Sequence, residues 1–133
     1  MSAGNADRFR NPLKTARGLG SAKSGTGHFW WQRVSAAALA LLSPWLVGLL
    51  VALAGQDVMT IQAVLAKPWN AILMTLFVLA LFWHLKQGMQ VVIEDYVHNR
   101  TVELASHILL TLACVTGVLA SVYAIARIAL LAS

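Results

Sequence analysis

Apolar residues gather into three long stretches, and short polar segments separate them. The stretches cover residues 34–54, 69–96 and 104–131; the second has a few polar interruptions and the third has one arginine. Each exceeds the roughly 20 residues that a helix rising about 1.5 Å per residue needs to cross about 30 Å of hydrocarbon. The pattern therefore predicts an all-α membrane protein with three transmembrane helices.

Composition agrees with a membrane protein. Of the 133 residues, 59% are hydrophobic and only 11% are charged, whereas about a quarter of the residues in a soluble domain are charged. The first apolar stretch follows more than thirty mostly polar residues and is too long for the core of a cleaved signal, so we expect it to remain in the mature protein. The chain has one cysteine, Cys114, which excludes an internal disulfide and most metal motifs.

Positive charges predict the orientation of the helices. Six cations precede the first stretch and Arg100 lies in the second loop, while Lys67 and Arg127 lie on the opposite side; the six are Arg8, Arg10, Lys14, Arg17, Lys23 and Arg33. Lysine and arginine accumulate on the cytoplasmic side of membrane proteins, so we expect a cytoplasmic N-terminus. The second helix then runs inward and ends at the cytoplasmic surface.

Residues 1–33 form a basic, glycine- and serine-containing arm ahead of the three-helix anchor, residues 34–133. The arm fits two roles equally well, contact with lipid headgroups or docking of a soluble partner. A mitochondrial presequence is a further alternative, but a bacterial inner membrane is favoured because the arm is short and runs directly into the first helix. The charge is too sparse and too close to the membrane to predict nucleic-acid binding.

Most candidate functional residues lie in the stretch FWHLKQGMQVVIEDYVHNR, residues 82–100. On a helix His84, Gly88 and Asp95 share one face, and His84 lies about 16 Å from Asp95, near the middle of the membrane. An ionisable residue at this depth is a candidate functional residue. A hydrogen bond to a neighbouring helix is the alternative for His84. At Gly88 the missing side chain admits either a haem edge or another helix.

Other polar residues of this stretch have ordinary explanations. Asp95 and Tyr96 fit an interfacial pair, with the acid solvated and the phenol at headgroup level. Lys86 points away from His84, and its stem can extend toward the headgroups.

The spacing His84-x3-Gly88-x6-Asp95-Tyr96, in a basic three-helix chain that also contains SGTGHFWWQRVSAAALALL, resembles the hydrophobic membrane-anchor subunit of succinate dehydrogenase (respiratory complex II), of the SdhD type. The resemblance covers roughly residues 20 to 130. It implies that His84 is an axial ligand of haem b iron and that Tyr96 binds ubiquinone. It further implies a proton-supplying role for Asp95 and places Arg33 near the haem propionates, with Gly88 beside the macrocycle.

The resemblance also implies a complex. Succinate oxidation would lie on a flavoprotein subunit and an iron–sulfur subunit docked on the cytoplasmic face, and this chain would attach them to the bilayer. A second membrane anchor, the cytochrome b subunit, would complete the haem-binding bundle. A fumarate reductase anchor and a haem-free membrane scaffold are the alternatives, and localisation to a mitochondrial inner membrane is the alternative to a bacterial one.

The depth of each histidine in the membrane limits which residue can be the second haem ligand. Only His107 lies in a predicted helix besides His84, since His28 and His98 fall outside the spans. Counted from the turn near Asn99, His84 is deeper than His107 by seven residues, or roughly 10 Å at 1.5 Å per residue. The two cannot easily bind one iron, so we expect the other ligand to come from another subunit.

Overall fold

The computed structural model describes residues 25–131, and all the regular structure in this part of the chain is helical. Three helices are long and one is short. They are α2 (Gly25–Leu53), α3 (Val58–Ala66), α4 (Pro68–Tyr96) and α5 (Arg100–Leu131).

The three long helices are apolar enough to cross a membrane. Their most apolar windows have mean hydropathies of 2.2 in α2, 1.6 in α4 and 2.3 in α5. With 29, 29 and 32 residues, they are about 40–50 Å long at 1.5 Å per residue. This exceeds the hydrocarbon thickness, so their ends reach headgroup depth. The predicted all-α fold with three candidate membrane spans is confirmed.

The first and third helices begin earlier than hydropathy alone predicts. Helix α2 starts at Gly25, so residues 25–33 of the predicted arm are helical; the rest of the arm, residues 1–24, lies outside the described residues. Helix α5 starts at Arg100, and the Asn99 side chain accepts hydrogen bonds from the backbone N–H groups of Thr101 and Val102 at 3.0 and 3.4 Å. Polar residues can continue a helix past the hydrocarbon because water and headgroups satisfy them there.

The short helix α3 was not predicted. Its N-cap is Asp57, whose carboxylate accepts hydrogen bonds from the Thr60 backbone N–H at 3.1 Å and from the Thr60 hydroxyl at 2.5 Å. At its other end Asn70 of α4 donates a hydrogen bond from Nδ2 to the Val64 carbonyl at 2.8 Å. Capping at both ends stabilises a helix that is too short to persist alone.

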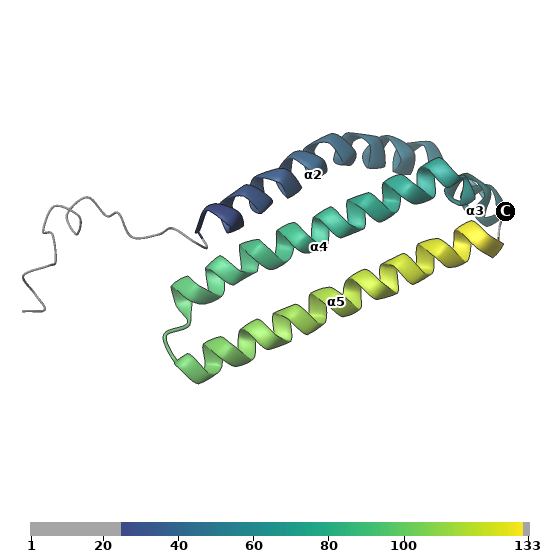
Figure 1. Ribbon diagram of the computed structural model, residues 1–133. Helices are drawn as coiled ribbons and strands as arrows, with labels where there is room; N and C mark the ends of the chain where they lie inside the picture. Colours follow the sequence, from purple (N-terminus) through teal and green to yellow (C-terminus); the bar gives the residue numbers. More distant parts are fainter. Residues whose placement is uncertain (1–24, 132–133) are drawn as a thin grey trace, which may run out of the picture.

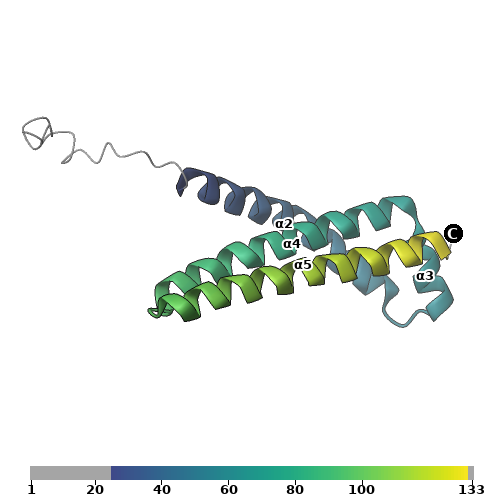
Figure 2. The same cartoon turned by 60° about the horizontal axis from the view of Figure 1, so that its bottom comes forward.

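Helix α4 contacts both α2 and α5 and lies between them in Figure 1, while Figure 2 shows α2 crossing behind the other two long helices. Helix α3 packs against α4 and α5 at the end of the bundle opposite the α4–α5 loop. Helix α2 follows a curved path (Figure 1) and contains Pro44. A proline inside a helix removes one backbone hydrogen bond and bends the helix, which accounts for the curvature.

Few side chains are buried within this chain. In the described part only Leu53, Ala66, Cys114, Ser35 and Gln87 are buried, while most large apolar side chains are exposed. Exposed apolar surface of this extent faces lipid or other subunits. The two buried polar residues therefore stand out: Ser35 belongs to α2 and Gln87 to α4.

Candidate functional site

Helix α4 presents different faces to its two neighbours. The ring of Phe82 packs against Gly117 of α5, while His84 contacts Ser35 of α2. Two residues span about 200° around a helix, so these contacts lie on opposite sides of α4. His84 is therefore turned away from α5.

A hydrogen bond links His84 to α2. The Ser35 Oγ lies 3.1 Å from His84 Nδ1, across 49 positions of sequence, and the same Oγ donates to the Gln32 carbonyl oxygen at 3.0 Å. Ser35 is only 6% exposed and His84 is half-buried. The predicted alternative for His84, a hydrogen bond to a neighbouring helix, is thus present, and it occupies only one of the two ring nitrogens.

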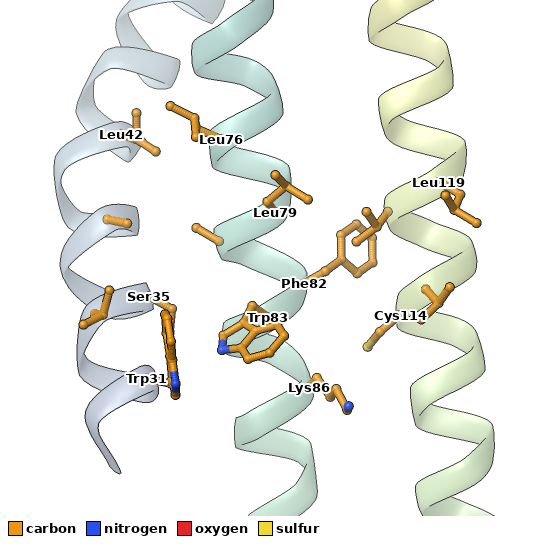
Figure 3. A pocket seen from close by; sticks show the side chains of 15 residues that line it. Trp31, Ser35, Leu42, Leu76, Leu79, Phe82, Trp83, Lys86, Cys114 and Leu119 are labelled. Atoms are coloured by element: carbon orange, nitrogen blue, oxygen red, sulfur yellow. The ribbon is translucent and has the colours of Figure 1, made fainter. Parts of the chain in front are cut away.

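An aromatic pair lies beside this hydrogen bond. Trp31, one turn before Ser35, meets Trp83, the residue before His84, with ring centroids 6.1 Å apart and an interplanar angle of 67°. Figure 3 shows Trp31 and Ser35 projecting from α2 toward Trp83 of α4. An edge-to-face pair adds to apolar contact because the ring edge is positive and the ring face negative. Two adjacent contacts therefore set the register of α2 against α4.

The other predicted site residues of α4 continue from His84 toward the α4–α5 loop. Gly88 lies one turn further along, and a Cβ added there would meet no atom within 4 Å. Asp95 is exposed, and Tyr96, the last residue of α4, is 78% exposed. Within residues 25–131 neither Asp95 nor Tyr96 makes a side-chain hydrogen bond. On the face of α4 that carries His84, the position of His84 contacts α2, while the positions of Gly88 and Asp95 are open for a partner.

Arg33 is not brought to His84. Its guanidinium carbon lies 4.4 Å from the centroid of the Phe29 ring on the same helix, and the residue is exposed. Arg33 is two positions from Ser35, which places it about 200° around α2. The structure supplies no contact that supports its predicted position near haem propionates, and that role stays a prediction.

The other three histidines of the chain lie outside α4. His28 is half-buried in the first turn of α2, His98 is exposed in the α4–α5 loop, and His107 is half-buried near the start of α5. Since His84 faces away from α5, helix geometry adds to the depth argument against His107 as its partner on one metal. No group of three or more potential metal ligands occurs in the part of the chain that the structure describes.

An apolar cavity of about 810 Å³ lies between α2, α4 and α5 (Figure 3). It is lined by Trp31, Trp83, Phe82, Lys86 and Cys114, among others, and Lys86 is the one charged residue in its lining. His84 is not among the lining residues, but its hydrogen-bond partner Ser35 is. The cavity therefore adjoins the Ser35–His84 hydrogen bond without including the imidazole in its lining.

Sequence reasoning missed two buried polar residues, Ser35 at the α2–α4 contact and Gln87 on α4. Ser35 holds His84, and Gln87 is 7% exposed with an Oε1 atom that has no hydrogen-bond partner in residues 25–131. Ser35 resembles other serines in apolar runs, such as Ser43. Only its position at the depth of His84 distinguishes Ser35 from these serines, and this position depends on how α2 packs against α4.

Together these features define a multi-pass helical membrane protein with an ionisable residue in its interior. Residues 7–120 match the family described as succinate dehydrogenase/fumarate reductase transmembrane subunit. The chain belongs to this family, which confirms the resemblance found in the sequence.

Three relatives share the name succinate dehydrogenase hydrophobic membrane anchor subunit. The protein from Paracoccus denitrificans is 34% identical over 92% of this chain and 95% of its own length. That from Rickettsia conorii is 34% identical over 88% and 94%, and that from Rickettsia bellii is 42% identical over 67% and 71%. No solved structure matches the chain significantly.

Proposed function

We propose that this chain is the membrane anchor of a succinate:ubiquinone oxidoreductase and that it supplies one axial ligand, His84, to a haem b shared with a second anchor subunit. Family membership supports the anchor role. The observation that carries the haem assignment is the half-buried imidazole on the face of α4 turned away from α5, with one ring nitrogen that makes no hydrogen bond within residues 25–131.

The residues of this face fit a haem. A haem needs an imidazole nitrogen for the iron and apolar surroundings for the macrocycle. His84 offers the nitrogen, Gly88 leaves open space one turn away, and exposed Leu85 and Val92 supply apolar surface on neighbouring positions. When bound, the haem supplies a one-electron carrier. The chain's own contribution is to hold the imidazole at a fixed depth and to keep water from it.

The quinone part of the proposal concerns the end of α4. A quinone that becomes a quinol develops negative charge on its carbonyl oxygens and takes up protons there. The Tyr96 hydroxyl can donate a hydrogen bond to such an oxygen, and the exposed Asp95 carboxyl can pass protons from the water. Adjacent helical residues diverge by about 100°, so the two side chains have separate tasks.

The proposed assembly includes subunits that carry the redox groups for succinate oxidation, because this chain has no sequence motif for them. Its sequence contains no flavin-binding or iron–sulfur cysteine motif, so a flavoprotein and an iron–sulfur subunit would oxidise succinate and deliver electrons at the end of the bundle that holds Tyr96. The second anchor subunit would cover the part of the His84 face of α4 that is open. We place the complex in a bacterial inner membrane with the N-terminus cytoplasmic, as the charge distribution predicts.

Replacement of single histidines in the assembled complex tests the haem assignment. His84→Ala should abolish or strongly alter the low-spin haem spectrum, measured as the reduced pyridine haemochrome and as the native visible bands. His107→Ala is the matched control, a half-buried helical histidine that should leave the spectrum unchanged. An unaltered spectrum in assembled His84→Ala would reject ligation by this residue.

A further inference from the structure

A buried hydroxyl in α2 touches the histidine of α4. Ser35 Oγ lies 3.0 Å from the Gln32 carbonyl oxygen and 3.1 Å from His84 Nδ1. A serine hydroxyl has one proton to donate, and a carbonyl oxygen can only accept. With the proton directed to Gln32, the Ser35 oxygen must accept from His84, so Nδ1 carries the hydrogen.

We infer that Ser35 is a positioning residue that fixes the tautomer and the ring plane of His84, leaving the Nε2 lone pair for the haem iron. This inference rests on the proposed function. Metal-binding histidines generally donate their other ring N–H to an oxygen acceptor, which orients the ring and raises its basicity. Here the acceptor is an uncharged hydroxyl whose own orientation is set by the backbone of its helix.

The surroundings of Ser35 keep this hydrogen bond in place. Ser35 is buried, so water does not compete for the imidazole proton. The Trp31–Trp83 pair lies directly beside it and connects the same two helices. A shift of α2 along α4 would break both contacts, and therefore the register of these helices determines the ring plane of His84.

The hydrogen bond has an electronic consequence. An imidazole that donates from Nδ1 is more electron-rich at Nε2, and an electron-rich ligand favours ferric over ferrous iron. Loss of the acceptor should therefore raise the haem reduction potential. It should also free the ring to rotate, which changes the electron paramagnetic resonance spectrum of the ferric haem.

Three substitutions in the intact complex test the role of Ser35. Ser35→Ala removes the acceptor and should shift the haem reduction equilibrium about tenfold toward the ferrous form, which corresponds to about 59 mV for one electron. Ser35→Thr keeps a hydroxyl and should restore the wild-type potential and spectrum. Ser43→Ala, a half-buried serine of the same helix without a side-chain hydrogen bond among the described residues, is the matched control.

The outcomes separate this inference from the proposed function. If His84→Ala loses the haem while Ser35→Ala keeps the wild-type potential and resonance spectrum, ligation stands and the role of Ser35 is refuted. If Ser35→Thr behaves like Ser35→Ala, the hydroxyl is not the acceptor and the inference also fails. If His84→Ala keeps the native haem, ligation itself fails and the inference fails with it.

Discussion

The two sides of α4 differ in the kind of contact that they make. Toward α2 the contact is polar and aromatic, with the Ser35–His84 hydrogen bond and the Trp31–Trp83 pair. Toward α5 the contact is apolar and close, with Phe82 against Gly117. Helix α4 thus makes a hydrogen-bonded contact on one side and a closely packed contact on the other.

This difference follows from the forces available in a bilayer. Lipid tails are as apolar as leucine, so helices associate through close packing at small residues and through interhelical hydrogen bonds. The α4–α5 pair relies on the first and the α2–α4 pair on the second. A packed interface tolerates little change in volume, whereas a hydrogen-bonded interface is sensitive to the chemistry of single atoms.

Gly117→Leu should have the largest effect on stability, since it acts on the packed side. A Cβ at Gly117 would already overlap the Phe82 ring, and a full side chain would force α5 away from α4. Overpacking of this kind typically costs about 1–3 kcal/mol, occasionally more, and we expect the upper end. Thermal unfolding of the detergent-purified complex, followed by retention of its subunits, measures the loss.

Gly48→Leu is the matched control for this prediction. Gly48 lies on α2, and an added Cβ there would meet no atom within 4 Å. A leucine should cost nothing and should improve helix propensity slightly. Equal losses of thermal stability at the two glycines would mean that the α4–α5 contact does not depend on Gly117.

Tyr96→Phe tests the exposed end of α4, beyond both interfaces. The change removes only the hydroxyl, and one lost hydrogen bond to the developing charge of a quinone should cost about 1–3 kcal/mol, or roughly ten- to a hundredfold in quinone reduction. Succinate oxidation by an artificial dye that accepts electrons before the quinone should persist. A wild-type rate with unchanged inhibitor sensitivity would return Tyr96 to the role of an interfacial anchor.

Gln87→Met tests the effect of the buried polar side chain on α4. The Oε1 of Gln87 is buried without a hydrogen-bond partner among residues 25–131, and an unsatisfied buried polar atom costs about 1–3 kcal/mol. Methionine has a similar length and no such requirement, so we expect a gain of about 1 kcal/mol in the thermal unfolding of the complex. A marked loss instead would show that a group outside residues 25–131 satisfies this oxygen.

The smallest effect concerns α3 at the end of the bundle. Hydrogen bonds from the Thr60 hydroxyl and backbone N–H lower the pKa of the Asp57 carboxyl. A carboxyl with a lowered folded-state pKa contributes stability above its unfolded pKa, and this stability is lost as the pH falls through the folded pKa. Exchange of the Thr60 amide hydrogen should therefore accelerate, relative to a neighbouring amide, below the usual aspartate range.

Asp57→Asn supplies the control for the pH effect. Asparagine caps a helix about as well as aspartate but does not titrate in this range. Relative protection of the Thr60 amide should become independent of pH in this variant. A persistent acid response would place the titrating group elsewhere.

Sequence alone predicted the spans well and the contacts poorly. Length and hydropathy identify the three long helices because the requirement to cross hydrocarbon acts on each helix separately. They misplace the start of α2, since the helix begins at Gly25 and includes Trp30, Trp31 and Arg33, which precede the predicted apolar stretch. The nine-residue α3 was missed although Asp57 followed by Thr60 is a recognisable cap.

In the candidate site, too, the positions along one helix were predictable and the contacts between helices were not. The alignment of His84, Gly88 and Asp95 on one face follows from helical periodicity and was predictable. The partner of His84 was not, because the pairing with Ser35 depends on the relative depth of two helices that α3 and two loops connect. No periodicity within one helix contains that information.

Cys114 gives the molecule a built-in probe of its own local opening. It is the one cysteine in the sequence, it is buried, and it lies three residues before Gly117 on α5. Because Cys114 is 7% exposed, its thiol reacts slowly with an alkylating reagent while the surrounding helices stay packed, and the labelling rate rises when they part. We expect slow alkylation of Cys114 in the resting complex and faster alkylation when α4 and α5 separate. The alkylation rate then measures how often these helices separate, with no probe introduced into the chain.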